Sequence, residues 1–127
     1  MGMYVELIFG ATLKKDTPIK IIETLKYMSG GTCLLPKNTI PKDLCSYLFR
    51  RGSYYFAINE PVCKMWLDDI DKCWHISTRS NIKNYNNEIE TFLEWIKPYI
   101  SYGSGSRDLY AITIYEEDKK PKLYYLK

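Results

Sequence analysis

The sequence has one histidine and four cysteines in 127 residues, and this scarcity narrows the chemistry open to it. Cys33, Cys45, Cys63 and Cys73 form no C-x-x-C pair, and no signal peptide precedes the first expected strand. Both features are typical of reduced thiols and favour a cytoplasmic protein. Zinc could be proposed from Cys63, Cys73 and His75, but only the C-x-H pair has a defined geometry, so we expect no metal.

Long apolar runs, nucleotide-binding signatures and a strong net charge are missing as well. No apolar run approaches the roughly 20 residues that span a bilayer, so we expect no membrane partner. Neither a P-loop nor a dinucleotide fingerprint is present, and no cofactor is expected. The formal net charge is +3, from 18 Lys and Arg against 15 Asp and Glu. This excess is too small to indicate bulk binding to nucleic acid or to membranes.

The signatures of two enzyme classes are incomplete. The segment His75-Ile76-Ser77 resembles half of the H-x-[ST] signature of two-histidine phosphoesterases. Those enzymes need one histidine as base and a second as acid, and the second is missing. The "GSGS" segment at residues 103–106 is not a G-x-S-x-G elbow, because it follows an expected helix instead of joining a strand to a helix. We therefore expect no catalytic residue and favour a non-enzymatic protein.

Aromatic residues are abundant: 12 Tyr, 4 Phe and 3 Trp make up 15% of the chain. One small core cannot hold so many rings, so some of them should lie on a surface that recognises a partner. A chain of 127 residues has the length of one domain and can bury roughly two-thirds of its unfolded surface. We expect a single α+β domain over residues 1–127.

Hydrophobic periodicity predicts the secondary structure for most of the chain. Alternation predicts a strand in "MYVELIFGATLK" near the N-terminus, and Asp16 or Thr17 is placed to cap a helix that has Pro18 at its first position. A second helix is expected at about Glu88–Lys97, with Asn87 and Glu90 in capping-box positions. The residues from Thr32 to Arg50 give no clear pattern. Further strands are expected at Ser53–Ile58, Val62–Leu67, Cys73–Arg79, "DLYAITIYEE" and "KLYYL".

This order of strand, helix, meander, helix and hairpin predicts the fold class. It follows the split β-α-β logic of a ferredoxin-like sandwich with an antiparallel-rich sheet and extra strands. Parallel strands joined through a helix cross over right-handed, so we expect both helices on one sheet face. If the first strand and the Cys73–Arg79 strand run parallel, both helices also begin at the same edge of the sheet.

The shared edge would make an anion-binding site. Helix N-termini present unpaired N–H groups and partial positive charge. The segments "LKKDT" and "TRSNIKN" would meet there, with cations surrounding the helix ends and neutral side chains supplying hydrogen bonds to a phosphate or carboxylate. The alternative is a set of solvated loops with ordinary caps and surface lysines. The expected ligand-binding residues are Lys14, Lys15, Thr17, Arg79, Ser80, Asn81 and Lys83.

The sheet face without helices is a second candidate surface. Alternation places Trp74, Ile76 and Thr78 in the core and leaves His75 and Arg79 pointing outward. The matching outward set of the first strand is Tyr4, Glu6, Ile8, Gly10 and Thr12. Such a face could pair with a second copy of the chain, stack a base, or lie under a loop, and we expect a homo-oligomer.

A nucleic-acid alternative depends on "RRGSYYFAI" (Arg50–Ile58), which resembles the core of an RNA-recognition strand. In such strands aromatic side chains stack on bases. Ser53 occupies the position of the first aromatic residue, so the alternation is displaced by one residue and the rings fall on the wrong faces. An ordinary strand rich in Tyr and Phe explains the segment equally well.

The C-terminal part carries a resemblance to a group of proteins. The segments "SNIKNYNNEIETFLEWIKPYI" and "YEEDKKPKLYYL" are similar to a signature of small uncharacterised bacterial and prophage accessory proteins. This resemblance implies a stand-alone module, such as those with which phages block or sequester host defence components. It implies no catalytic residues.

These observations predict a binding module that sequesters a small anionic ligand such as a nucleotide. One alternative is a protein-interaction module, of inhibitor or immunity type, that acts through the Tyr-rich sheet face. A second alternative is an RNA- or DNA-binding domain, whose affinity would fall steeply with salt.

Overall fold

The computed structural model describes residues 4–30, 48–50, 61–84, 87–101 and 108–126. The expected strand Ser53–Ile58, most of the segment Thr32–Arg50 and most of "RRGSYYFAI" lie outside these residues. The other expected strands and both expected helices are confirmed. In chain order the elements are β1 (Val5–Leu13), α1 (Ile19–Met28), β2 (Val62–Leu67), β3 (Trp74–Ile82), α3 (Glu88–Ile96), the 3-10 turn η1 (Lys97–Tyr99), β4 (Ile100–Ser101), β5 (Leu109–Tyr115) and β6 (Lys122–Tyr125).

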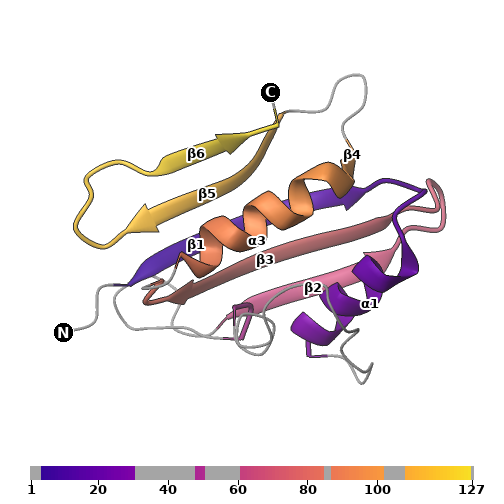
Figure 1. The fold of residues 1–127 in the computed structure, drawn as a ribbon, viewed down its shortest axis with the longest axis horizontal. Helices are drawn as coiled ribbons and strands as arrows, with labels where there is room; N and C mark the ends of the chain where they lie inside the picture. Colours follow the sequence, from indigo (N-terminus) through magenta and orange to yellow (C-terminus); the bar gives the residue numbers. More distant parts are fainter. Residues whose placement is uncertain (1–3, 31–47, 51–60, 85–86, 102–107, 127) are drawn as a thin grey trace.

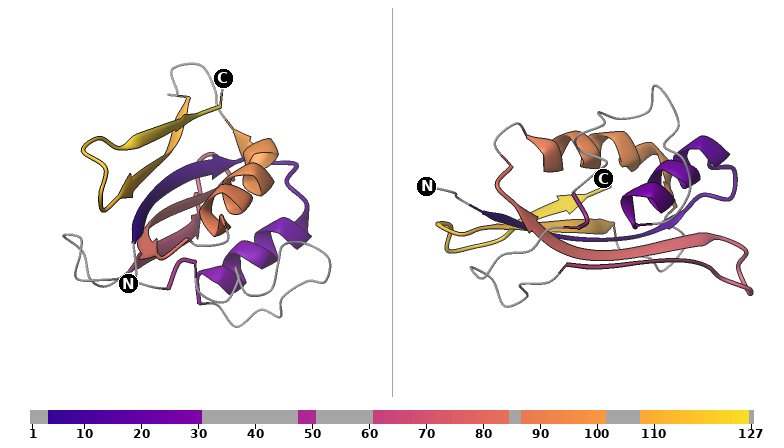
Figure 2. Two further views of the ribbon diagram at one scale, coloured as in Figure 1. Left: turned by 60° about the vertical axis from the view of Figure 1, so that its left-hand side comes forward. Right: turned by 90° about the horizontal axis from the view of Figure 1, so that it is seen from below.

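The described strands form one six-stranded sheet with β1 at its centre (Figure 1). The order across the sheet is β2-β3-β1-β5-β6, and the short β4 pairs with the end of β1. Each pair is antiparallel. Figure 2 shows α1 and α3 on the same face of this sheet. The α+β class and the placement of both helices on one face therefore agree with the prediction.

The parallel orientation of β1 and β3, on which the shared anion site depends, is not found. β1 and β3 are antiparallel neighbours, with Val5 opposite Ile82 and Thr12 opposite His75. β3 lies between β1 and β2, and because it is antiparallel to both, β1 and β2 run parallel to each other, with α1 in the connection between them. α1 follows the end of β1 whereas α3 follows the end of β3, which lies beside the start of β1. The two helices therefore begin at opposite ends of the sheet.

The core lies between the helices and one face of the sheet. Leu7 and Phe9 of β1 are at most 1% exposed, because alternate residues of a half-covered strand point to the same face. Three phenylalanines meet there: Phe92 of α3 lies edge-on to both Phe9 and Phe49, with ring centroids 5.1 Å apart in each pair. Aromatic rings prefer this T-shaped arrangement. The helix-covered face therefore has a packed aromatic centre.

The helix starts differ from the predicted caps. Asn87 precedes α3 in a left-handed conformation and makes no side-chain cap bond. The Asn84 side chain caps the helix start instead. Its Oδ1 accepts the backbone N–H of Ile89 at 2.8 Å, and its Nδ2 donates to Glu90 at 2.9 Å. α1 begins at Ile19 after Pro18, also without a side-chain cap. Neither described helix is long and apolar enough to cross a membrane.

Candidate functional site

The predicted ligand-binding residues are divided between the two ends of the sheet. One group follows the end of β1 and contains Lys14, Lys15 and Thr17. The other group lies at or after the end of β3, where Arg79 is opposite Ile8 and Asn81 is opposite Glu6. Because β1 and β3 run in opposite directions, the groups cannot converge at one edge. The predicted shared anion site is therefore wrong as a single site.

Residues of the β3 group hold the fold together. Arg79 pairs with Glu6, and its Nη2 lies 3.0 Å from Oε1 of that carboxylate. Ser80 is 1% exposed and donates its hydroxyl proton to the Leu48 carbonyl at 2.8 Å. Asn81 is also 1% exposed. Because both side chains are buried, neither Ser80 nor Asn81 has surface that a ligand could contact. Their role is therefore structural, unlike that of a neutral polar residue in an exposed loop.

Lys83 and the β1 group are more accessible. The Lys83 ammonium lies 5.8 Å from the centre of the Tyr4 ring. Lys14 and Lys15 are exposed, whereas the Thr17 hydroxyl is buried and donates to the Lys14 carbonyl at 2.6 Å. Among the expected residues, the two lysines after β1 are thus available to an anion at that end of the sheet.

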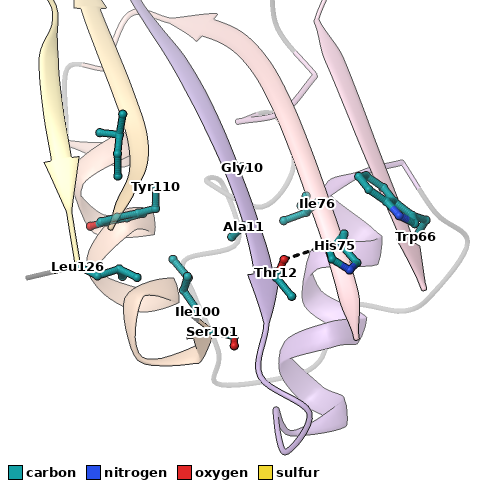
Figure 3. Close-up of a pocket in the computed structure, with 11 residues that line it drawn as sticks. Gly10, Ala11, Thr12, Trp66, His75, Ile76, Ile100, Ser101, Tyr110 and Leu126 are labelled. Atoms are coloured by element: carbon teal, nitrogen blue, oxygen red, sulfur yellow. Dashed lines mark hydrogen bonds between the residues drawn. The ribbon is translucent and has the colours of Figure 1, made fainter. Parts of the chain in front are cut away.

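A row of four polar or aromatic side chains crosses the same end of the sheet on the face without helices. The row is set by strand register: Trp66 of β2 is opposite His75 of β3, His75 is opposite Thr12 of β1, and Thr12 is opposite Ser101 of β4. Directly opposed residues of antiparallel strands have their side chains on the same face. We call Trp66, His75, Thr12 and Ser101 the His75 row (Figure 3).

His75 is held on three sides. Its Nε2 lies 2.9 Å from Oδ2 of Asp71. Its Nδ1 lies 2.9 Å from the Thr12 hydroxyl (Figure 3). The Trp66 ring stacks on the imidazole with centroids 5.4 Å apart. A carboxylate only accepts hydrogen bonds, so the donor–acceptor count assigns the proton of the neutral ring to Nε2 and leaves Nδ1 to accept from Thr12.

The turn between β2 and β3 lowers the pKa of Asp71. The Cys73 backbone N–H donates to its Oδ1 at 2.8 Å, and this bond is the main reason that the pKa of Asp71 lies below its ordinary value. Desolvation is the next largest effect and opposes this lowering of the pKa, whereas the hydrogen bond and charge of His75 and the positive charge of Lys15 lower the pKa further. Asp71 therefore remains a carboxylate that can orient His75 and stabilise positive charge on it.

A cavity of about 380 Å³ opens beside the His75 row and includes Thr12, His75, Trp66 and Ser101 in its lining. Its origin is a gap in the sheet. β5 pairs with β1 only from Val5 to Phe9, and β4 pairs only with Thr12 and Leu13. The intervening Gly10–Ala11 segment of β1 has no strand partner on that side among the described residues. Ligand pockets commonly have volumes of roughly 300–1,000 Å³.

Tyr110 lines the far side of this cavity (Figure 3). It is placed there by an irregularity in β5, where the pairing with β6 shifts between Leu109 and Ala111. Burial, followed by the nearby Glu94 and Tyr124, raises the pKa of Tyr110 above its ordinary value. A phenol is protonated near neutral pH and the raised pKa favours that form further, so Tyr110 can act as a hydrogen-bond donor.

One group of described side chains has the donor atoms for a metal ion. Ligand atoms of Asp68, Asp71 and His75 all lie within 4.8 Å of one another. These side chains already have hydrogen-bond partners. Asp68 accepts the backbone N–H of Ile70 at 2.7 Å, and Asp71 accepts a hydrogen bond from His75. The zinc site considered from the sequence consisted of Cys63, Cys73 and His75. Cys63 lies on the opposite sheet face from His75, and its thiol contacts the Ser29 hydroxyl at 3.2 Å.

The alternation of residues predicts that His75 and Thr12 lie on the open face, but it does not predict their contact. Their contact depends on the antiparallel register of β1 with β3, which no local pattern encodes. Asp71 and Ser101 are absent from the residues that the sequence predicts to bind a ligand. The alternation of "WHISTR" and the acidic turn before it are the signals that were available.

The geometry is the basis for assigning a function. Comparisons of the chain with protein-family models, with curated proteins and with solved structures find no match. The His75 row and its cavity are therefore interpreted from their own contacts, burial and charge.

Proposed function

We propose that the protein is a binding module that takes up a small anionic ligand, such as a nucleotide, in the cavity beside the His75 row. The observation that carries this proposal is the cavity of about 380 Å³, whose lining includes hydroxyls of two strands and an imidazole fixed at both nitrogens. Sites for small molecules combine a concave surface with a few placed polar groups. A sequestering role, as the sequence resemblance implies, is compatible with a cavity of this size.

The chemistry of the lining supports a ligand with both a flat and a charged part. Trp66 is 37% exposed and presents ring surface beside His75. Thr12 and Ser101 supply hydroxyls, and Lys14 follows β1 directly after the row. Lys15 lies near enough to lower the pKa of Asp71. A ring could stack on the exposed aromatic surface while a phosphate or carboxylate approaches the lysines.

Isothermal titration calorimetry against mononucleotides, dinucleotides, cyclic nucleotides and simple carboxylates tests this proposal. The chain offers a matched control, because Lys14 and Lys15 lie at the cavity end whereas Lys83 lies at the other end of β3. We expect Lys14→Ala and Lys15→Ala to weaken binding about fivefold to tenfold each, and Lys83→Ala to leave it unchanged. Absence of binding across the panel, or equal loss in all three variants, would contradict the proposal.

A protein-interaction role is the second candidate, supported by exposed apolar side chains on β2 and the turn after it. Val62 is 51% exposed, Leu67 48% and Ile70 93%. β2 is also an edge strand of the described sheet. Exposed apolar groups on an edge strand favour self-association or a protein partner. Light scattering after size exclusion tests self-association: a homo-oligomer that Ile70→Glu converts to a monomer would support it, and a monomeric wild-type protein would not.

A further inference from the structure

We infer that the His75 row is a catalytic site for acyl transfer, in which Thr12 attacks a small carboxylic ester and His75 moves the proton. This inference rests on the proposed function in one respect, because the ester must enter the same cavity. It goes beyond binding, since a chain of hydrogen bonds links Asp71, His75 and Thr12 at 2.9 Å for each step. A carboxylate, an imidazole and a hydroxyl in this order are the groups that activate a nucleophilic alcohol.

The direction of the hydrogen bonds fits proton removal from Thr12. With Nε2 donating to Asp71, Nδ1 has a free lone pair and accepts the Thr12 hydroxyl proton. Thr12 Oγ1 then keeps its lone pairs for attack on a carbonyl carbon. Stacking on Trp66 and the two hydrogen bonds hold the imidazole in this orientation. A histidine that served only to bridge two strands would not need a cavity along the same hydroxyl.

Ser101 is placed to stabilise the charge that develops on the substrate. It is the register partner of Thr12 on the side away from His75, and both line the cavity. Opposed residues on one sheet face have Cβ atoms about 4.5–5.5 Å apart, so the two hydroxyls can reach the same carbonyl group. Figure 3 shows Thr12 between His75 and Ser101. The Ser101 hydroxyl can therefore donate to the oxyanion while Thr12 forms the new bond.

The reaction balances without an oxidant or a metal ion. Thr12 Oγ1 bonds to the carbonyl carbon as its proton moves to Nδ1 of His75. The carbon–oxygen bond to the leaving alcohol then breaks, and that alcohol takes the proton from Nδ1. Water next attacks the acyl-Thr12 ester and gives a proton to Nδ1, and Thr12 recovers it as the carboxylic acid leaves. Asp71 stays ionised throughout and acts as a positioning residue for the imidazole.

The cavity and its surroundings limit the substrate class. A volume of about 380 Å³ suits a small ester and excludes a folded polypeptide. Lys14 and Lys15 favour an anionic group on the alcohol or on the acid. The inferred substrate is therefore a small ester of a carboxylic acid with a phosphate or carboxylate nearby.

The test uses p-nitrophenyl acetate as probe, because acylation releases coloured p-nitrophenolate and leaves an acetyl group on the protein. We expect mass spectrometry of the digested protein to find acetyl on Thr12. Thr12→Val should abolish this label, and Thr12→Ser should retain it. His75→Gln should slow acylation about a hundredfold or more, and Ser101→Ala about a hundredfold. Ser77→Ala changes an exposed hydroxyl of the same strand and should leave the rate unchanged.

The test of Asp71 must measure a quantity that a purely structural role of this residue would leave unchanged. We expect Asp71→Asn to lower kcat with little change in KM, and Asp71→Glu to restore part of kcat because the carboxylate is kept. Equal loss in both variants would count against a positioning role for this carboxylate. Thermal unfolding of each variant separates these effects from loss of the fold.

The outcomes distinguish the inference from the proposed function. If calorimetry shows lysine-dependent binding but no acetyl appears on Thr12, acyl transfer is overturned and the binding function stands. If Thr12 is acetylated but no anionic ligand binds, catalysis stands and the ligand class is overturned. Turnover that survives Thr12→Val, or that a chelator removes, would also overturn the inference, the second result pointing to the Asp68, Asp71 and His75 group.

Discussion

The two ends of the β1–β3 pair carry similar chemistry in opposite environments. At one end Glu6 and Arg79 bridge the strands with a contact of 3.0 Å, and at the other Thr12 and His75 bridge them with a contact of 2.9 Å. Glu6 is 1% exposed, so solvent does not reach the carboxylate of the first bridge. The second bridge lines a cavity.

The difference shows that a polar bridge on the open sheet face is not by itself a functional signal. A buried carboxylate needs its partner, because an unpaired charge away from water is costly. A half-buried hydroxyl and imidazole can exchange their mutual bond for one to water or to a ligand at little cost. The Glu6 end is therefore expected to govern stability, and the His75 end is expected to govern binding.

The largest expected effect comes from breaking the closed bridge. Arg79→Ala leaves the Glu6 carboxylate buried without its cation and should lower the free energy of unfolding by about 3 kcal/mol. Chemical denaturation measures this loss. Replacing both partners, as Glu6→Leu with Arg79→Met, should cost less than Arg79→Ala, because no buried charge then remains. If Arg79→Ala costs no more than an exposed substitution, the bridge has no structural role.

A smaller loss is expected at Ser80, which was first predicted to bind a ligand. Ser80→Ala removes the hydroxyl that donates to the Leu48 carbonyl at 2.8 Å, and should cost about 1–2 kcal/mol. Ser77→Ala on the same strand is the matched control, because Ser77 is exposed and should change stability by less than about 0.5 kcal/mol. Weaker ligand binding in Ser80→Ala at unchanged stability would restore the first prediction.

The elements were predictable from the sequence because their patterns are local. Alternation in β1 and the apolar stripe of α3 each depend on a few consecutive residues, and both elements were found. The pairing of β1 with β3 was not predictable in this way. It joins residues about 70 positions apart, and a parallel partner would have buried the same alternate side chains of β1.

The same limit applies to the residues of the site. Lys14 and Lys15 were assigned from their position after β1, and the structure leaves them exposed at that end. Ser80 was assigned to a loop, but β3 continues to Ile82 and buries it. The contact between Thr12 and His75 needs the register, and the role of Asp71 needs the turn geometry. Local patterns identified the charges, whereas long-range pairing created the cavity.

A still smaller loss of stability is expected at the open bridge. Thr12→Val keeps the shape of the side chain and removes only the hydroxyl, so we expect the free energy of unfolding to fall by about 0.5 kcal/mol. Ligand affinity should nevertheless fall about tenfold, because the hydroxyl lines the cavity. Calorimetry and denaturation on the same preparation measure both quantities. A stability loss like that of Arg79→Ala would remove the distinction between the two ends.

The smallest expected effect is in the titration of Asp71, which can be followed through its carboxyl carbon by NMR. The folded-state pKa lies below the ordinary value of 3.8, so the ionised form is favoured by folding. Its contribution to stability is present above pH 3.8 and is lost as the pH falls through the lower folded value. The Cys73 backbone N–H is the larger cause and the His75 bond a smaller one. His75→Phe should therefore move the midpoint only partway back toward 3.8, and a complete return would show that the imidazole, and not the turn, is the main cause of the lowered pKa.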